Sequence, residues 1–245
     1  GLHLVAGRRE ERLRFDYQKS LAARLGDTDD ADALGVEKMM QRFYRSAAIV
    51  RRVGERLLQR FEVHLAGSQP PQQIDADFAG RGEYLDSSTP GWLEADPAHV
   101  FALFAAWAAT PGLRGLHSQT ARELAAALPL IPAYGDAPAA LRDAFMQLLR
   151  GPQAVLTLER MARLGVLGRW IPAFQSVSGR MQFDLFHVFT VDQHTLAVLR
   201  NLASPRYSKM MRGSSCCSEM ASNASSLVDG APPGVFTSAG NFNSS

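Results

Sequence analysis

Apolar residues recur at spacings of three and four along most of this chain, a pattern typical of amphipathic helices. The longest such run extends from Val36 to about Leu65 and predicts one long helix whose apolar stripe faces a core. At 1.5 Å per residue this helix would measure roughly 40 Å, which is enough to brace a whole domain. The opposite face carries arginines, among them Arg42, Arg45, Arg51, Arg52, Arg56 and Arg60.

That arginine face has two interpretations. Solvated charges are the ordinary one for the polar side of a long helix. Alternatively, guanidinium groups bind phosphates and carboxylates well, so Arg42 and Arg45, with Tyr44 between them, are candidate contacts for a nucleotide or an acidic partner.

The acidic run at residues 27–32 also has two interpretations. It is expected to form a solvated linker rather than a Mg²⁺ clamp, because no partner carboxylate on a strand accompanies it.

Shorter helical patterns flank the long helix. Residues 1–25 predict a helix after a short lead, and Gly26 is suited to end it. After residue 96, start signals predict a series of short helices, at Asp96, at the capping-box pair Thr120 and Glu123, at Pro138 and at Pro152. Gly151 and Gly165 are expected to end two of them.

Strand-type alternation is nearly absent. Residues 72–96 contain several glycines and prolines and are expected to form an extended link with turns. The sequence therefore predicts an all-α fold, a multi-helix assembly with one long amphipathic helix and short connections between antiparallel neighbours.

Histidines accompany a strong helical pattern over residues 180–202, which predict a helix with a wide buried face. His187 and His194 are seven residues apart, or two turns, so both are expected on one side of it. Helical metal phosphohydrolases present their first ligand in this manner, which makes His194 a candidate metal ligand. A packed core histidine is the plain alternative. His187 is a candidate substrate contact, with packing an equally good interpretation.

Composition excludes little. The chain has 245 residues, of which 46% are hydrophobic and 20% charged, with a net charge of +2, so bulk charge favours neither nucleic acid nor a membrane surface. No apolar run is long enough to span a bilayer. The only cysteines, Cys216 and Cys217, are adjacent. Neighbouring cysteines rarely form a disulfide with each other, so a reducing cytoplasm is the default expectation. Residues 210–245 are rich in serine and glycine and are expected to be disordered.

Several stretches together resemble a known family. They read LHLVAGR at residues 2–8, LRFD at 13–16, VEKMMQRFYR at 36–45, LRGLH at 113–117, LPLI at 128–131, VLG at 166–168, RMQFDLFH at 180–187 and VDQHT at 191–195. This sequence resembles the bacterial bifunctional uridylyltransferase/uridylyl-removing enzymes, which modify the PII nitrogen-signalling protein. The resemblance extends over about residues 1–209.

The resemblance implies a domain order. Residues 1–65 would be the end of a nucleotidyltransferase region with its bracing helix, residues 66–176 a helical region, and residues 177–209 the start of a truncated HD domain. In the family, the first domain transfers UMP from UTP to PII, the HD domain hydrolyses it off, and ACT domains sense glutamine. The chain lacks an initiator methionine, and we expect it to be a piece of a longer protein.

The family's Mg²⁺-binding carboxylates and its HD doublet have no counterpart in this sequence, and only the first hydrolytic ligand maps, onto His194. No catalytic residue is therefore assigned, no metal is expected in this piece, and we expect it to be inactive by itself. Two alternatives stay open. One is a non-catalytic helical module that binds PII or a nucleotide. The other is a stand-alone HD-like metal phosphohydrolase, which would lose a stoichiometric bound metal in a His194→Ala variant.

Overall fold

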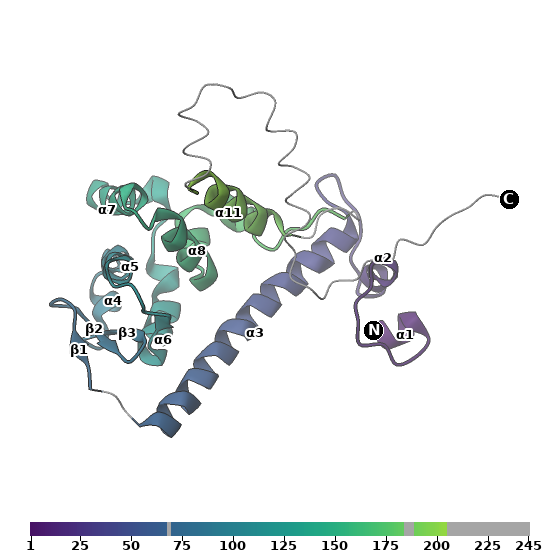
Figure 1. Ribbon diagram of the computed structural model, residues 1–245. Helices are drawn as coiled ribbons and strands as arrows, with labels where there is room; N and C mark the ends of the chain where they lie inside the picture. The colour runs from purple at the N-terminus through teal and green to yellow at the C-terminus, as the bar shows by residue number, and fades with distance from the viewer. Residues whose placement is uncertain (68–69, 184–188, 205–245) are drawn as a thin grey trace. The chain divides into compact units, whose positions relative to one another are not determined.

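The structure is a computed structural model that describes residues 1–67, 70–183 and 189–204 (Figure 1). The chain divides into two compact units, Gly1–Leu199 and Arg200–Ser245. The elements described below lie in the first unit, except for the last residues of α11. No helix among the described residues has the length and apolar character that crossing a membrane requires.

The predicted long helix is confirmed as α3, Gly35–Ala66, with 32 residues (Figure 1). At 1.5 Å per residue it is roughly 48 Å long. Its start is fixed by side chains that accept the free amide groups of its first turn. Asp29 accepts the amide of Gly35 at 2.6 Å, and Glu37 accepts that of Leu34 at 3.3 Å. Gly67, with a φ of 77°, follows its last turn.

A small core surrounds the first turns of α3. Helices α1 (Leu2–Ala6) and α2 (Phe15–Arg24) precede it. The predicted helix within residues 1–25 is therefore present as α2, and its lead contains α1. Buried apolar side chains from α2, from α3 and from the segment after α10 form this core: Leu21, Ala22, Val36, Met39, Met40 and Met181.

A four-stranded sheet corrects the prediction of an all-α fold. The strands are β1 (Gln72–Gln73), β2 (Phe78–Arg81), β3 (Tyr84–Ser87) and β4 (Gly115–Leu116), in the order β1-β2-β3-β4. β3 pairs antiparallel with β2 and parallel with β4. The expected extended link thus contains a hairpin. Its strands have four residues or fewer, and β2 is almost wholly buried, so neither strand shows the alternation that marks a half-exposed strand.

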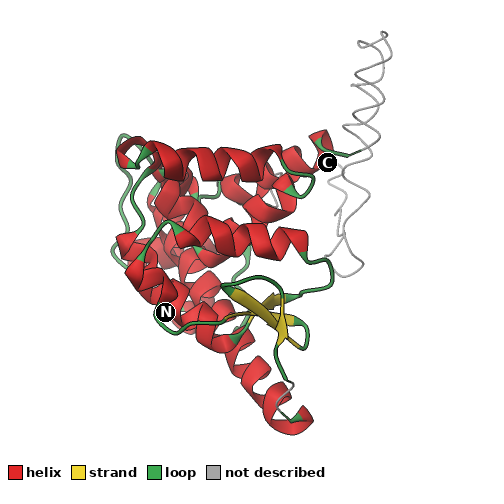
Figure 2. Cartoon of the chain, turned by 90° about the vertical axis from the view of Figure 1, so that its left-hand side faces the viewer, coloured by secondary structure: helices red, strands yellow, loops and turns green. Residues whose placement is uncertain are grey.

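Helices enclose the main core beside this sheet (Figure 2). They are α4 (Trp92–Ala95), α5 (His99–Ala109), α6 (Ser118–Ala127), α7 (Ala139–Arg150), α8 (Ala154–Leu164), α9 (Val166–Trp170) and α10 (Pro172–Val177). Two 3₁₀ turns, Leu128–Leu130 and Tyr134–Asp136, join them. Aromatic rings fill the centre, with the ring centroids of Phe101 and Trp170 4.8 Å apart in an edge-to-face pair.

Some predicted helix boundaries hold and one does not. Gly165 ends α8 with a φ of 88°, and Gly151 follows the last residue of α7, as expected. The prediction of a capping box formed by Thr120 and Glu123 is wrong. Helix α6 already begins at Ser118, and the Thr120 hydroxyl donates to Asp86 instead, at 2.6 Å. The hydroxyl oxygen of Thr120 accepts the amide of Ser87 at 2.9 Å and so caps no amide of α6.

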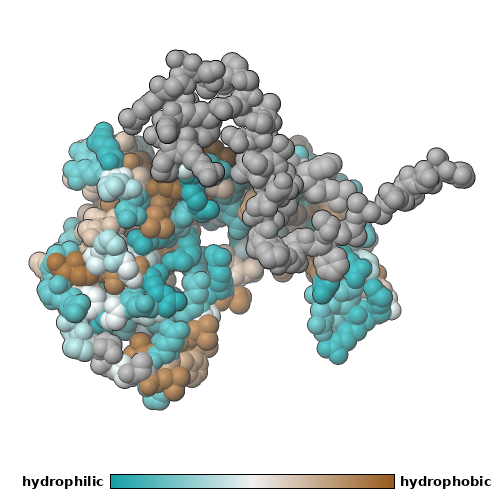
Figure 3. Space-filling view, viewed as in Figure 1, coloured by the Kyte–Doolittle hydropathy of each residue, from teal (hydrophilic) through white to brown (hydrophobic). Residues whose placement is uncertain are grey.

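The expectation that the apolar stripe of α3 faces a core holds only for its first turns. Beyond Met40 the stripe is exposed, with each of these residues at least 49% accessible: Phe43, Val50, Val53, Leu57, Leu58, Phe61 and Leu65. Brown hydrophobic surface is visible near the lower end of α3 (Figure 3). The polar face of α3 meets the main core instead, and Gln59 is only 5% exposed.

The last described helix is shorter than predicted. Helix α11, Val191–Leu202, begins eleven residues after the expected start at Arg180, and residues 180–183 are not helical. None of the described side chains of α11 is buried, so the expected wide buried face is absent from it. His187 lies outside the described residues.

Candidate functional site

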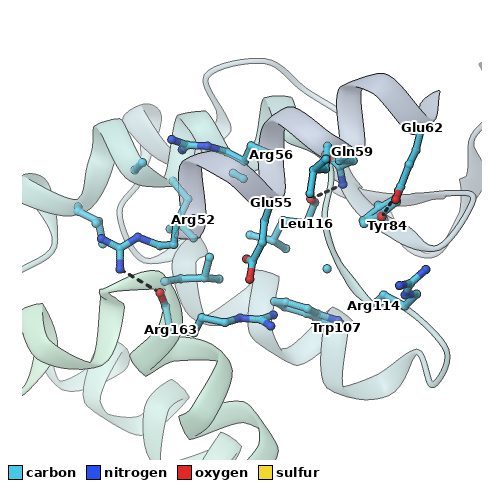
Figure 4. A pocket seen from close by; sticks show the side chains of 17 residues that line it. Arg52, Glu55, Arg56, Gln59, Glu62, Tyr84, Trp107, Arg114, Leu116 and Arg163 are labelled. Atoms are coloured by element: carbon cyan, nitrogen blue, oxygen red, sulfur yellow. Dashed lines mark hydrogen bonds between the residues drawn. The ribbon is translucent and has the colours of Figure 1, made fainter. Parts of the chain in front are cut away.

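A cavity of about 340 Å³ lies between the polar face of α3 and the main core (Figure 4). The long helix contributes Arg52, Glu55, Arg56, Gln59 and Glu62 to its wall, at the spacings of three and four that place residues on one face. Trp107 of α5, Leu116 of β4 and Leu124 of α6 provide apolar wall, and Arg163 comes from the end of α8. Its volume is within the range of small-molecule sites.

Positive charge dominates this wall. Ion pairs in this region join Arg51 to Glu55 at 3.9 Å and Arg114 to Glu83 at 2.7 Å. Arg52 donates from Nη1 only to a neutral acceptor, the backbone oxygen of Arg163, at 3.2 Å. Burial lowers the pKa of Arg52, and the neighbouring charges of Arg51 and Arg56 lower it further.

Acceptors also line the cavity. Gln59 donates from Nε2 to the backbone oxygen of Leu116 at 2.9 Å, while its buried Oε1 has no partner among the described residues. Glu62 accepts the hydroxyl of Tyr84 at 3.0 Å. Glu55 and Arg163 point toward one another across the space (Figure 4). The arrangement can therefore both donate to an anion and accept from hydroxyl or N–H groups.

A second polar cluster joins β3 to α6. Asp86 is 6% exposed and accepts the hydroxyl of Thr120 at 2.6 Å and Nε of Arg81 at 2.5 Å, and His117 Nδ1 lies 3.3 Å from it. Burial by itself would raise the pKa of Asp86, but His117, Thr120 and Arg81 together lower it to about 2. Thr120 also accepts the amide of Ser87 at 2.9 Å. Within this polar cluster the Asp86 carboxylate is paired with Arg81 and His117, which is typical of a structural cluster.

No pattern along the chain marks His117 or Asp86 as a functional residue. Asp86 lies in the region that was expected to be an extended link, and 31 residues separate it from His117. Only the pairing of β3 with β4 brings the two together. Spacing along the chain therefore carried no signal for this cluster.

The predicted substrate contacts on α3 lie outside the cavity wall. Arg42 forms an ion pair with Asp27, donating from Nη2 to Oδ2 at 2.6 Å, and this lowers the pKa of the Asp27 carboxyl. Arg45 donates to the backbone oxygens of Ser178 at 3.0 Å and Gln175 at 2.8 Å. Within the described residues, these guanidinium groups attach other segments of the chain to α3. Their binding of a substrate stays a prediction.

The remaining predicted residues have simpler positions. The hydroxyl of Tyr44 lies 3.7 Å from the sulfur of Met181, beside the small core. His194 is exposed on α11, and its amide donates to the backbone oxygen of Thr190 at 2.8 Å. Over the described ranges, no three His, Cys, Asp or Glu side chains are grouped as a metal site would need. The ligand role of His194 stays a prediction, as does the substrate contact of His187, which lies outside those ranges.

Comparison with known proteins supports the resemblance. Residues 78–170 match the family described as "Uridylyltransferase GlnD third domain", and residues 1–58 match "GlnD PII-uridylyltransferase". A bifunctional uridylyltransferase/uridylyl-removing enzyme of Xanthomonas campestris pv. campestris (strain B100) is 67% identical over 203 residues, which are 83% of this chain and 23% of that relative. The enzyme of that name from Thiobacillus denitrificans is 43% identical, covering 82% of this chain and 24% of the relative. No solved structure matches.

Both family matches are to parts of uridylyltransferases, which are a class of nucleotidyltransferase. Within that class the chain belongs to the GlnD uridylyltransferase family, and the resemblance found in the sequence is confirmed. The chain spans about a quarter of the length of the curated relatives that it matches. The 78–170 match extends from the start of β2 to the end of α9, and the 1–58 match ends within α3.

Proposed function

We propose that this chain is part of an enzyme that transfers UMP from UTP to the PII nitrogen-regulatory protein and hydrolyses it off again in response to glutamine. Its support is the 67% identity to a bifunctional uridylyltransferase/uridylyl-removing enzyme over 203 residues. The proposal includes a cytoplasmic location, with PII and UTP as partners and no nucleic acid or membrane. Glutamine would act through ACT domains that have no counterpart in this sequence.

We infer that the described residues support the reaction rather than carry it out. Nucleotidyl transfer and HD-type hydrolysis both use a divalent metal, Mg²⁺ or another, to neutralise charge on the reacting phosphate. Such a metal needs several carboxylate or imidazole ligands at one place. Of the family's hydrolytic ligands only His194 has a counterpart in this sequence, and on that ground we propose that the isolated chain is inactive.

Labelled UTP and purified PII test this directly. We expect the purified chain to transfer no UMP to PII, and to release none from uridylylated PII, with or without Mg²⁺ or Mn²⁺. The full-length Xanthomonas campestris enzyme is the positive control in both directions. Transfer or release above the protein-free rate would contradict the proposed inactivity.

A second candidate function is a binding module without turnover. The observation that favours it is the set of guanidinium groups around the cavity, since arginine binds phosphates well. Calorimetric titrations of the chain with PII and with UTP test it, and saturable heat without UMP transfer is the expected result. Flat titrations with both would exclude this role.

A further inference from the structure

One face of α3 is an apolar seam that no described element of the chain covers. It lies about 180° around the helix from the buried Gln59, since each residue advances a helix by about 100°. Its members follow one another at alternating spacings of four and three, and the four large side chains among them are between 51% and 70% exposed. The seam consists of Phe43, Ala47, Val50, Gly54, Leu57 and Phe61.

Such alternating spacings are those of a coiled-coil contact, in which the seam of one helix packs against a second helix. Gly54 points to the same use. Glycine inside a helix costs about 0.5–1 kcal/mol relative to alanine, and nothing lies within 4 Å of a Cβ added at Gly54, so no described part of the chain requires glycine there. With Ala47 it leaves the seam shallow at its middle, where the backbone of a second helix can approach closely.

Exposed apolar side chains are concentrated in the same part of the chain. Among the described residues, eleven large hydrophobic side chains that are exposed belong to residues 1–65, and three belong to residues 78–170. The segment that matches the third-domain family therefore buries most of its own apolar groups, whereas the segment that ends with α3 does not. Most of the seam lies within the 1–58 match, and this chain covers only 23% of the Xanthomonas campestris relative.

We propose that the seam is the docking surface for an amphipathic helix with acidic edges, which belongs to the longer enzyme and lies outside this chain. Acidic edges are inferred because the exposed Arg51 and Arg60 flank the seam on its two sides. A second copy of the chain would present the same arginines at its own edges, so self-pairing lacks this complementarity. The inference rests on the proposed function only in making the chain a part of a longer enzyme.

Hydroxyl-radical footprinting, which oxidises side chains at rates that follow their exposure to solvent, tests the proposal. This chain is compared with a chimaera in which residues 35–66 replace the aligned helix of the full-length Xanthomonas campestris enzyme, so that both proteins contain an identical α3. We expect oxidation of Phe43, Leu57 and Phe61 to be slower in the chimaera by about fivefold or more, because a packed interface excludes water. Ile49 is the matched control, since it is 54% exposed on the same helix but outside the seam, and its rate should not change.

Two results would overturn the proposal. One is equally fast oxidation of the seam in both proteins, which means that nothing in the longer enzyme covers it. The other is slow oxidation in this chain alone, which means that a second copy or another part of this chain covers the seam, and sedimentation velocity distinguishes these two cases. Circular dichroism reports whether the chimaera folds, and the unmodified enzyme provides the same comparison over its aligned peptide.

A Gly54→Leu variant adds a second readout. In this chain the leucine would enter open space, and the melting temperature is expected to stay unchanged or to rise. In the chimaera the leucine would hold the docked helix away, and the melting temperature is expected to fall. Equal shifts in the two proteins would overturn the docking surface. Neither readout measures UMP transfer, so this proposal and the proposed function can fail separately.

Discussion

Gln59 of α3 and Leu116 of β4 are 57 residues apart in sequence, and the Nε2 of Gln59 donates to the backbone oxygen of Leu116 at 2.9 Å. This bond is buried, and it connects the long helix to the sheet through a polar group. Tyr84 and Arg52 make further polar contacts along the same face of α3. The long helix is therefore attached to the main core by its polar side.

Replacing Gln59 should weaken this attachment. We expect Gln59→Met to lower the free energy of unfolding by about 1 kcal/mol, since one buried hydrogen bond is lost while a buried unpaired acceptor is removed with it. Urea denaturation followed by circular dichroism measures the change. The control is Arg60→Met, because Arg60 is the next residue along the chain and its side chain is exposed. This variant should change the free energy of unfolding by less than about 0.5 kcal/mol. Equal effects in both variants would contradict the role of the Gln59 bond.

The two halves of the apolar stripe of α3 should respond differently to truncation. Met40 is 4% exposed in the small core, so Met40→Ala is expected to cost about 2–3 kcal/mol. Leu57 is 53% exposed, and Leu57→Ala should cost less than about 1 kcal/mol. The same denaturation measurement compares them. A cost for Leu57→Ala as large as that for Met40→Ala would mean that another surface covers the stripe in solution.

Two glycines should respond in opposite directions to alanine. Gly179 has a φ of 70°, and a Cβ there would lie 3.2 Å from the backbone oxygen of Gln41, so Gly179→Ala is expected to cost about 1–2 kcal/mol. Gly54 lies within α3 with nothing within 4 Å of an added Cβ, and Gly54→Ala should stabilise by about 0.5–1 kcal/mol. Melting temperatures that move the same way in both variants would contradict this.

Acid should destabilise the chain in part through Asp86. Its pKa in the folded chain, about 2, is below the ordinary value of 3.8, so its stabilising contribution is complete above about pH 4 and is lost as the pH falls toward 2. We expect that contribution to be roughly 1–2 kcal/mol, because Arg81 is partly exposed to solvent.

Asp86→Asn isolates this contribution. The stability difference between the variant and the original chain should shrink between pH 4 and pH 2, measured by denaturant unfolding at each pH. Asp77→Asn, which removes an exposed carboxylate just before β2, is the control. An Asp86→Asn difference that does not change with pH would mean that the carboxylate is not held ionised.

The sequence by itself determined the long helix, the ends of α7 and α8 and the family. Spacings of three and four, glycine stop signals and the VEKMMQRFYR and VDQHT stretches are local properties that need no partner to be recognised. The start of α11 and the short strands were missed. Residues 180–183 share the apolar pattern of a helix, and strands of two to four residues are too short to show a period.

Only the tertiary structure decided which face of α3 meets the main core and which residues line the cavity. Periodicity divides a helix into an apolar and a polar face, but it does not say what each face contacts. Arg52 and Gln59 have the same spacing whether they lie in water or against Leu116. Likewise Asp86 and His117 meet only because β3 and β4 pair, although α4 and α5 lie between them in the sequence. The physical reason is that such contacts depend on the path of the whole chain.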